Sequence, residues 1–121
     1  MDLAPTFLEL AGVEYPAGDS VQPMRGESIN ALLAGTSDAV HDENYLTVLS
    51  HQGRVVVRQG KWKLSTLEPP FDETEFGLFD LEVDPGESND LAESEPEKYQ
   101  EQLELWRMER RNLGIVLPQD L

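Results

Sequence analysis

The sequence predicts an α+β fold, in which a small four-stranded antiparallel sheet is packed by a C-terminal helix. Two observations support this prediction. Between Tyr45 and Leu81, short segments of strand-like composition follow one another and are separated by turn residues, a pattern typical of an antiparallel meander. Beyond Pro96, apolar side chains recur at the spacing of an amphipathic helix. Short helical segments precede the strands.

The first segment predicts a short helix. Asp2 is an expected N-cap and Gly12 an expected C-cap, and Pro5 lies in the first turn, where its missing N–H does no harm. The side chains of one face are apolar: Leu3, Phe7, Leu10 and Ala11. Because so brief a helix is unstable alone, it needs an apolar surface to lie against, and we expect this chain to lack that surface.

An irregular stretch and a second short helix come next. Residues Val13 to Gly26 contain two prolines and two glycines, a composition that favours a surface loop. Residues Glu27 to Ala34 then predict a helix that Gly35 ends.

Four strands follow, with a turn at Gln52-Gly53. In the second strand, alternation places Val55 and Val57 on one face and Val56 with the flanking arginines on the other. In the third strand, Trp62 and Leu64 are expected to face the core and both lysines to face outward. The residues from Leu67 to Phe76 are expected to leave the sheet as a polar excursion. The expected strands are Tyr45–Ser50, Arg54–Gln59, Lys61–Thr66 and Leu78–Leu81.

The C-terminal part predicts a turn and a helix. Residues 84–87, Asp-Pro-Gly-Glu, have the composition of a type II turn with Gly86 at positive φ. Ser94 and Glu97 form a candidate capping box, with Pro96 in the first turn. Gly114 is the expected end of the helix. The stripe expected to bury apolar surface consists of Tyr99, Leu103, Trp106 and Arg110, with Leu105 and Met108 at its edge.

Composition restricts the classes of function. A chain of 121 residues builds at most one modest domain. The net charge of −15 opposes binding to nucleic acid, and no run approaches the roughly 20 apolar residues of a membrane span. No signal peptide is expected after Met1. The absence of cysteine removes disulfides and thiolate chemistry, and it leaves the compartment open between cytoplasm and periplasm.

Few residues are candidates for chemistry. His41 and His51 are the side chains that titrate near neutrality, and each is interpreted first as an ordinary surface histidine. The acidic residues from Asp80 to Glu87 start like a calcium loop, but Pro85 and Leu91 replace required residues, so a structural turn is favoured. Four basic residues gather in one hairpin, either as an anion-facing patch or as protection of the sheet edge. They are Arg54, Arg58, Lys61 and Lys63.

The most specific motifs of the chain resemble the C-terminal portion of sulfatases, within the alkaline phosphatase superfamily. They are residues 57–64, Val-Arg-Gln-Gly-Lys-Trp-Lys-Leu, and the run from Phe79 through Asp84-Pro85-Gly86 to Leu91. The resemblance extends over nearly the whole chain, and its ending is similar to bacterial arylsulfatases. It implies that residues 1–40 close a larger α/β domain and that residues 41–121 form the C-terminal subdomain, a four-stranded sheet packed by a helix.

The resemblance also implies an activity that this chain does not carry by itself. Sulfatases hydrolyse sulfate esters with a formylglycine and a calcium ion, and the motifs for both are expected in a catalytic domain upstream of Met1. No catalytic residue and no metal ligand is therefore assigned here. His51 and Arg54 are the candidates for contact with substrate, because their hairpin can line the substrate mouth.

Two interpretations remain open. In the first, the chain completes the fold of an arylsulfatase and shapes one wall of its cleft, and its partner is the upstream catalytic domain. In the second, it is a stand-alone, non-catalytic binding module that associates with itself or a partner through the apolar N-terminal helix. A reading frame that continues upstream would support the first, and a true start at Met1 the second.

Overall fold

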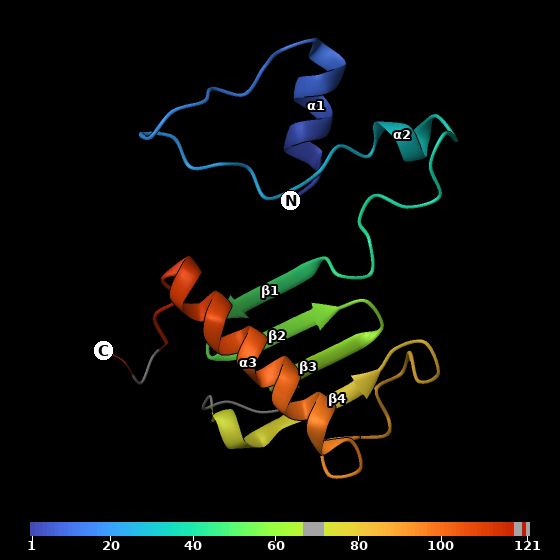
Figure 1. Cartoon of the computed structure of the whole chain (residues 1–121), viewed down its shortest axis with the longest axis vertical. Helices are drawn as coiled ribbons and strands as arrows, with labels where there is room; N and C mark the ends of the chain where they lie inside the picture. Colours follow the sequence, from blue (N-terminus) through green and yellow to red (C-terminus); the bar gives the residue numbers. More distant parts are fainter. Residues whose placement is uncertain (67–71, 118–119, 121) are drawn as a thin grey trace. The chain divides into compact units, whose positions relative to one another are not determined.

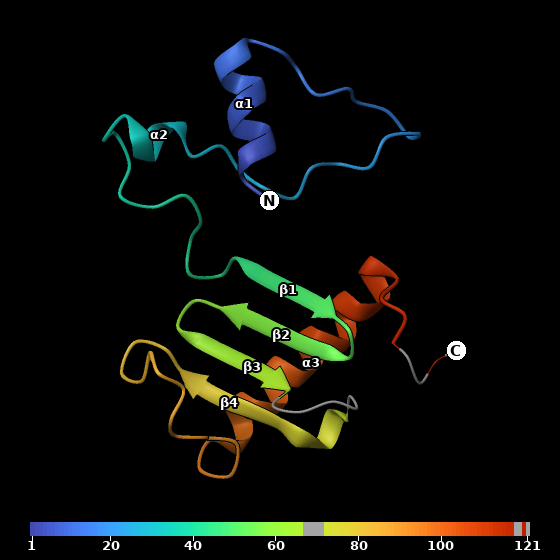
Figure 2. The ribbon, with the colours of Figure 1, turned by 180° about the vertical axis from the view of Figure 1, so that it is seen from behind.

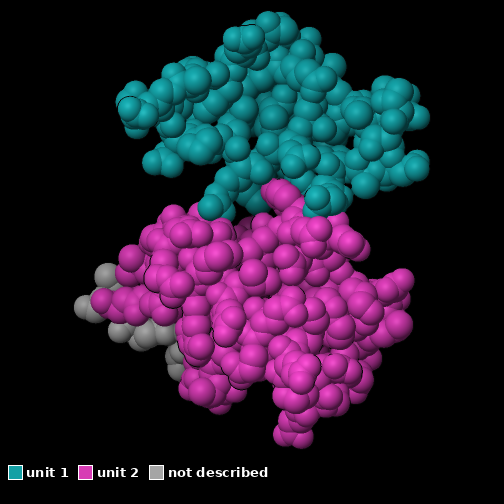
Figure 3. All heavy atoms as spheres, in the orientation of Figure 1, with its two compact units in different colours: residues 1–42 teal, residues 43–121 magenta. Residues whose placement is uncertain are grey.

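The computed structural model describes residues 1–66, 72–117 and 120 (Figure 1). The chain divides into two compact units, Met1–Asp42 and Glu43–Leu121 (Figure 3). The predicted α+β class is confirmed, since a four-stranded antiparallel sheet, a C-terminal helix and short N-terminal helices are all present. No helix in the described part of the chain is both long and apolar enough to cross a membrane.

The first unit contains two short helices, α1 (Leu3–Ala11) and α2 (Asn30–Leu33). Gly12 ends α1 in the left-handed region at φ 64°, as its position predicted. The second helix is shorter than the predicted Glu27–Ala34. Residues 27–29 lie outside α2, and there the Ile29 N–H donates to the Thr6 hydroxyl at 3.1 Å rather than to a helical carbonyl.

Asp2 does not cap α1 with its side chain, so this detail of the prediction is wrong. Its carboxylate instead accepts the Glu27 N–H at 3.2 Å and lies 3.0 Å from His41 Nε2. The hydrogen bond with His41 lowers the pKa of Asp2 below its ordinary value. Asp2 therefore ties the start of α1 to the chain after the loop.

The second unit is built on a sheet with the strand order β1-β2-β3-β4. The strands are β1 (Leu46–His51), β2 (Arg54–Gln59), β3 (Trp62–Thr66) and β4 (Phe76–Asp80), with a short 3₁₀ helix, η1 (Glu73–Glu75), before β4. Each strand pairs antiparallel with its sequence neighbour, which confirms the meander. The first part of the predicted polar excursion, residues 67–71, lies outside the described residues.

A two-residue turn joins β1 to β2. Gln52 and Gly53 both have positive φ, 50° and 79°, which is the backbone geometry of a tight hairpin whose twist matches that of its strands. The turn places His51 directly opposite Arg54 and Leu49 opposite Val56. The register of the hairpin is therefore set at this end of the strands.

Helix α3 (Pro96–Leu113) lies across one face of the sheet (Figure 1). Trp106 is fully buried there and meets the ring of Phe76 edge-on, with centroids 6.3 Å apart. The predicted inward alternation is confirmed for β2 and β3, although Trp62 is only half-buried. The buried apolar cluster consists of Val55, Val57, Leu64, Phe76, Leu78, Leu103, Trp106 and Leu117.

The predicted capping box of α3 is wrong. The helix begins at Pro96 after Glu95, and the Ser94 hydroxyl donates to the Leu91 carbonyl at 3.3 Å instead of accepting from the first turn. Gly114 ends the helix at φ 62°, as predicted. The start of α3 depends on the fixed φ of Pro96, which suits a first helical turn, rather than on side-chain capping.

Gln102 is a buried polar residue that the predicted stripe of α3 did not include. Its side chain is fully buried, and neither amide atom has a hydrogen-bond partner in the described part of the chain. A buried donor or acceptor left without a partner costs about 1–3 kcal/mol of folding free energy. The amide of Gln102 therefore weakens the packing of α3 on the sheet.

We expect Gln102→Leu to stabilise the second unit by about 1 kcal/mol or more, because an apolar side chain of similar size replaces an unsatisfied amide. Urea unfolding followed by the fluorescence of Trp62 and Trp106 measures this change. Gln100→Leu is the matched control, since Gln100 is exposed on the same helix and its replacement should change stability little. A loss of stability in Gln102→Leu would show that the amide is satisfied in solution.

Candidate functional site

The two candidate substrate residues lie together at one end of the β1–β2 hairpin. His51 and Arg54 are directly opposite each other in the strand register, and both side chains are exposed. They lie on the sheet face opposite α3, because successive residues of a strand face opposite ways and the neighbouring Val55 faces the core. Figure 2 shows this face of β1 and β2 with α3 behind it. The structure brings the pair together, and its role in substrate contact remains a prediction.

The same face continues along both strands. Leu49 pairs with Val56, and Thr47 pairs with Arg58. Leu49 keeps 57% of its surface exposed, whereas Val56 and Thr47 are half-buried. We call these side chains the open face of the β1–β2 hairpin. The open face consists of Thr47, Leu49, His51, Arg54, Val56 and Arg58.

The four basic residues of the predicted patch differ in their contacts with carboxylates. Lys61 Nζ lies 2.7 Å from Asp80 Oδ2, and Lys63 Nζ donates to Glu87 Oε1 at 2.5 Å. The hydrogen bond with Asp80 raises the pKa of Lys61 and lowers that of Asp80. The charges of the two lysines are therefore neutralised locally, and both alternatives for the four residues, an anion-facing patch and protection of the sheet edge, stay predictions.

The two arginines of the patch differ from the lysines. Arg54 and Arg58 are exposed, and neither has a carboxylate partner among the residues that the structure describes. Arg58 Nε donates to the carbonyl of Gly60 at 3.3 Å, which engages one of the five N–H groups of its guanidinium. The free positive charge of the hairpin is consequently on the open face.

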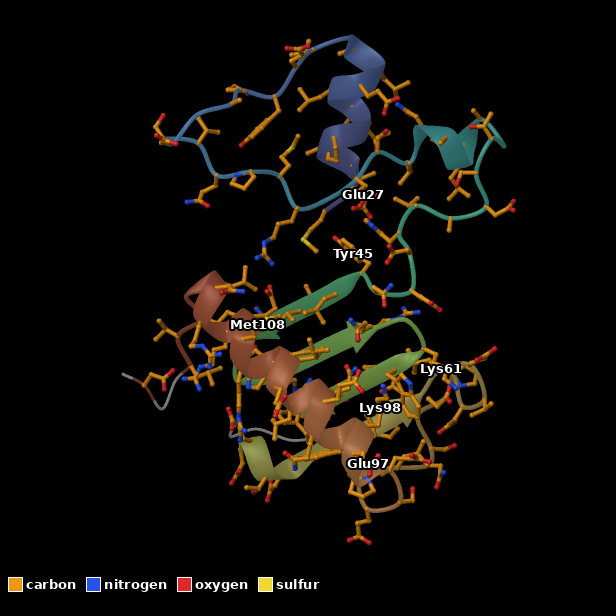
Figure 4. The ribbon with its side chains drawn as sticks, in the orientation of Figure 1. Glu27, Tyr45, Lys61, Glu97, Lys98 and Met108 are labelled. Carbon is orange, nitrogen blue, oxygen red and sulfur yellow. The ribbon has the colours of Figure 1, made fainter. Side chains whose placement is uncertain are left out.

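Trp62, on the α3 side of the sheet, has two ammonium groups near its ring. Lys61 Nζ is 5.1 Å and Lys98 Nζ 5.7 Å from the centre of its ring, within the range of a cation–π contact. Figure 4 labels both lysines near the start of α3. Cations of the chain itself therefore already contact this half-buried ring, and it does not offer a free aromatic surface to a ligand.

The acidic run after β4 is a structural turn. The Asp84 carboxylate accepts the N–H groups of Ser88 and Asn89, both at 2.8 Å, and Asp80 and Glu87 bind the two lysines. The left-handed residue is Glu87 at φ 53°, not Gly86, so the predicted type II turn is wrong. The Glu87 N–H still donates to the Asp84 carbonyl at 3.2 Å, so residues 84–87 turn where the sequence predicted a turn, and the Asp84 side chain accepts the N–H groups that follow.

The part of the chain that the structure describes contains no group of three or more His, Cys, Asp or Glu side chains placed to hold a metal ion. His41, the other histidine, contacts Asp2 and lies 3.8 Å from Glu27 Oε1. The partner of its Nε2 is thus Asp2, a residue 39 positions away in the sequence. This contact helps to hold the first unit together.

Sequence reasoning missed a cavity of about 350 Å³ at the C-terminal end of α3. Arg107 binds Glu73 at 2.9 Å and Arg110 binds Asp120 at 2.6 Å, so two of its three arginines already have carboxylate partners. The feature of the sequence that could have indicated this cavity is the cluster of arginines in the last turns of α3. Its lining residues are Glu73, Arg107, Arg110, Arg111, Gly114 and Ile115.

Known proteins resemble this chain over nearly all of its length. The family described as N-sulphoglucosamine sulphohydrolase, C-terminal, matches residues 1–112. An uncharacterized sulfatase of Schizosaccharomyces pombe is 31% identical over 125 residues, which cover 99% of this chain and 22% of that protein. The sequence resemblance is therefore confirmed at the level of a sulfatase C-terminal segment.

Solved structures share the fold. A 2-O GAG sulfatase covers 92% of this chain with a TM-score of 0.63 and 24% identity. A protein solved in complex with its substrate, D-glucosamine-2-N,6-O-disulfate, covers 91% with a TM-score of 0.64 and 23% identity. This chain spans only 24% and 23% of those two proteins, about a quarter of their length.

The hydrogen bonds that the ionised Asp84 carboxylate accepts predict that the protein loses stability in acid. Its hydrogen bonds, led by that from the Asn89 N–H, lower the pKa of Asp84 below the ordinary 3.8. The stabilisation is therefore complete above pH 3.8 and is lost as pH falls through the lower folded-state pKa. We expect Asp84→Asn to lower the melting temperature near neutral pH and to show a smaller further loss on acidification.

Thermal unfolding of both proteins across the acid range measures this effect. Glu104→Gln is the control, because Glu104 is exposed on α3 and has no hydrogen-bond partner among the described residues. Equal pH profiles for Asp84→Asn and the parent protein would contradict a stabilising role of the ionised carboxylate.

Proposed function

Since this chain belongs to the N-sulphoglucosamine sulphohydrolase C-terminal family, we propose that it works as the non-catalytic C-terminal part of a sulfuric ester hydrolase. The observation that carries the proposal is the family match over residues 1–112, in a chain that spans about a quarter of its relatives. In this role the chain completes the fold of the enzyme, and its β1–β2 hairpin supplies part of one wall of the substrate cleft. Its partner is the catalytic domain that makes up the rest of such a protein.

The proposed reaction of the complete enzyme is hydrolysis of a sulfate ester. The ending of the sequence favours an arylsulfatase, whereas one structural relative was solved with a sulfated glucosamine as its substrate, which makes a saccharide sulfate the favoured natural substrate class. His51 and Arg54 are the proposed contacts in this chain, because both are exposed at the same end of one hairpin. An arginine forms paired hydrogen bonds with an oxyanion, which suits a sulfate group.

A formylglycine nucleophile and a calcium ion are proposed for the catalytic domain only. The acidic turn after β4 does not fit calcium, since its oxygen ligands are engaged: Asp80 binds Lys61, Asp84 accepts backbone N–H groups and Glu87 binds Lys63. No step of the hydrolysis is therefore assigned to a residue of this chain.

A second candidate function rests on the exposed apolar face of α1. Leu3, Phe7 and Leu10 keep 62%, 63% and 68% of their surfaces exposed. Such a face on one short helix marks an interaction surface. In a sulfatase it would lie against the catalytic domain, and in a stand-alone binding module it would bind a partner or a second copy. The reading frame upstream of Met1 distinguishes the two.

We expect the purified chain to hydrolyse no aryl sulfate, with or without calcium, because the proposed nucleophile and ligands lie elsewhere. A chimera in which this chain replaces the matching C-terminal segment of the Schizosaccharomyces pombe sulfatase tests its supporting role. The chimera should be soluble and should recover aryl sulfatase activity relative to the same protein truncated before that segment. Turnover by the isolated chain that survives repurification would overturn the proposal.

Self-association of the isolated chain should depend on α1. The double variant Phe7→Ser and Leu10→Ser removes two exposed apolar side chains and is expected to shift the chain toward monomer in sedimentation velocity experiments. Val83→Ser is the matched control, because Val83 is 77% exposed but lies outside α1. A parent chain that is already monomeric at high concentration would contradict association through this face.

A further inference from the structure

The open face of the β1–β2 hairpin carries two exposed arginines in a strongly acidic chain. The protein carries 24 acidic and 9 basic residues. Most of its basic side chains bind a carboxylate: Lys61, Lys63, Lys98, Arg107 and Arg110. Arg54 and Arg58 have no such partner among the described residues, despite the large excess of acids. Their positive charge is therefore available to an external anion.

The strand register divides the open face into two corners and a middle. Arg54 lies opposite His51 at one corner, and Arg58 lies opposite Thr47 at the other. The two arginines are four positions apart on an extended strand, which separates their Cα atoms by about 13 Å. Each corner combines a guanidinium with a second hydrogen-bonding side chain, and these two groups together can bind one oxyanion.

The middle of the open face is apolar. Leu49 and Val56 are a direct cross-strand pair between the two corners, and Leu49 is 57% exposed. A ligand that fits all three parts is extended, carries anionic groups at a spacing of about 13 Å and offers an uncharged, partly apolar stretch between them. A saccharide chain with sulfate groups has this chemistry, because its C–H faces are apolar and its sulfates are fixed oxyanions.

We propose that the open face is a binding strip for a sulfated saccharide chain, with one sulfate at His51 and Arg54 and a second at Thr47 and Arg58. The sugar rings between the sulfates lie over Leu49 and Val56. The proposal rests on the proposed function, which supplies the sulfate ester, and extends it from one end of the hairpin to the whole strip. It assigns binding and no chemical step to these residues.

The size of the strip favours a saccharide over a protein partner. A stable protein interface buries about 800 Å² on each side around a substantial apolar centre, whereas the open face offers two aliphatic side chains between charged ends. Nucleic acid is disfavoured, since a chain of net charge −15 repels a continuous phosphate backbone. A short stretch of sulfated saccharide presents fewer charges and matches the local pair of arginines.

The test is calorimetric titration of the 121-residue chain with a sulfated heparin hexasaccharide and with the same hexasaccharide after desulfation. We expect binding of the sulfated form only, weakening as salt rises because exposed charges are screened. Arg54→Gln and Arg58→Gln should each lower the affinity about tenfold, since each removes charge-assisted hydrogen bonds. Leu49→Asp should also weaken binding, because it puts a carboxylate between the two sulfates.

Arg111→Gln is the matched control, because Arg111 is also exposed and has no carboxylate partner in the described part of the chain, yet it lies at the end of α3. An equal loss in Arg111→Gln would overturn the proposal in favour of unspecific charge attraction. No binding of the sulfated saccharide would overturn it, as would unchanged affinity in both hairpin variants.

A protein interface predicts a different result. If the hairpin variants bind the saccharide like the parent chain but lower the solubility or yield of the sulfatase chimera, the open face contacts the catalytic domain and the proposal is wrong. Failure of the binding strip leaves aryl sulfate hydrolysis by the unmodified chimera unaffected. The two proposals therefore fail independently. Circular dichroism of each variant verifies that the sheet is intact.

Discussion

The packing of Trp106 against the sheet is the contact on which the second unit depends. The indole is fully buried between α3 and the strands, and it meets Phe76 at the far edge of the meander. This contact assigns one face of the sheet to the core and leaves the other to solvent in β1 and β2. The exposure of Arg54 and Arg58 follows from it, because alternate residues of a strand face opposite ways.

Much of this arrangement could be predicted from short-range patterns. The alternation of Val55 and Val57 and the tight turn at Gln52-Gly53 are enough to locate the hairpin and its inward face from the sequence alone. The same two observations place His51 opposite Arg54, so that part of the candidate site also follows from the sequence. The position of Arg58 opposite Thr47, at the other corner of the open face, follows from the register of the same hairpin.

The predictions that are wrong concern side chains that can hydrogen-bond either to a neighbouring group or to a more distant one. Asp2 binds His41 and the Glu27 N–H instead of its own helix, and Asp84 caps later N–H groups instead of allowing a type II turn. Neither choice leaves a local signature, because an aspartate is equally able to serve either partner. The burial of Gln102 is hidden for a related reason: a polar residue on a helix is ordinarily assigned to the solvent-facing side.

The two-residue turn between β1 and β2 has a consequence for how such chains can diverge. Both of its residues have positive φ, and the register of all six cross-strand pairs follows from it. Inserting or deleting a single residue there would exchange the two faces of one strand, bringing arginines toward Trp106 and valines toward solvent. Length variation among homologous sequences should therefore accumulate in other loops, while this turn admits substitution but not a change of length.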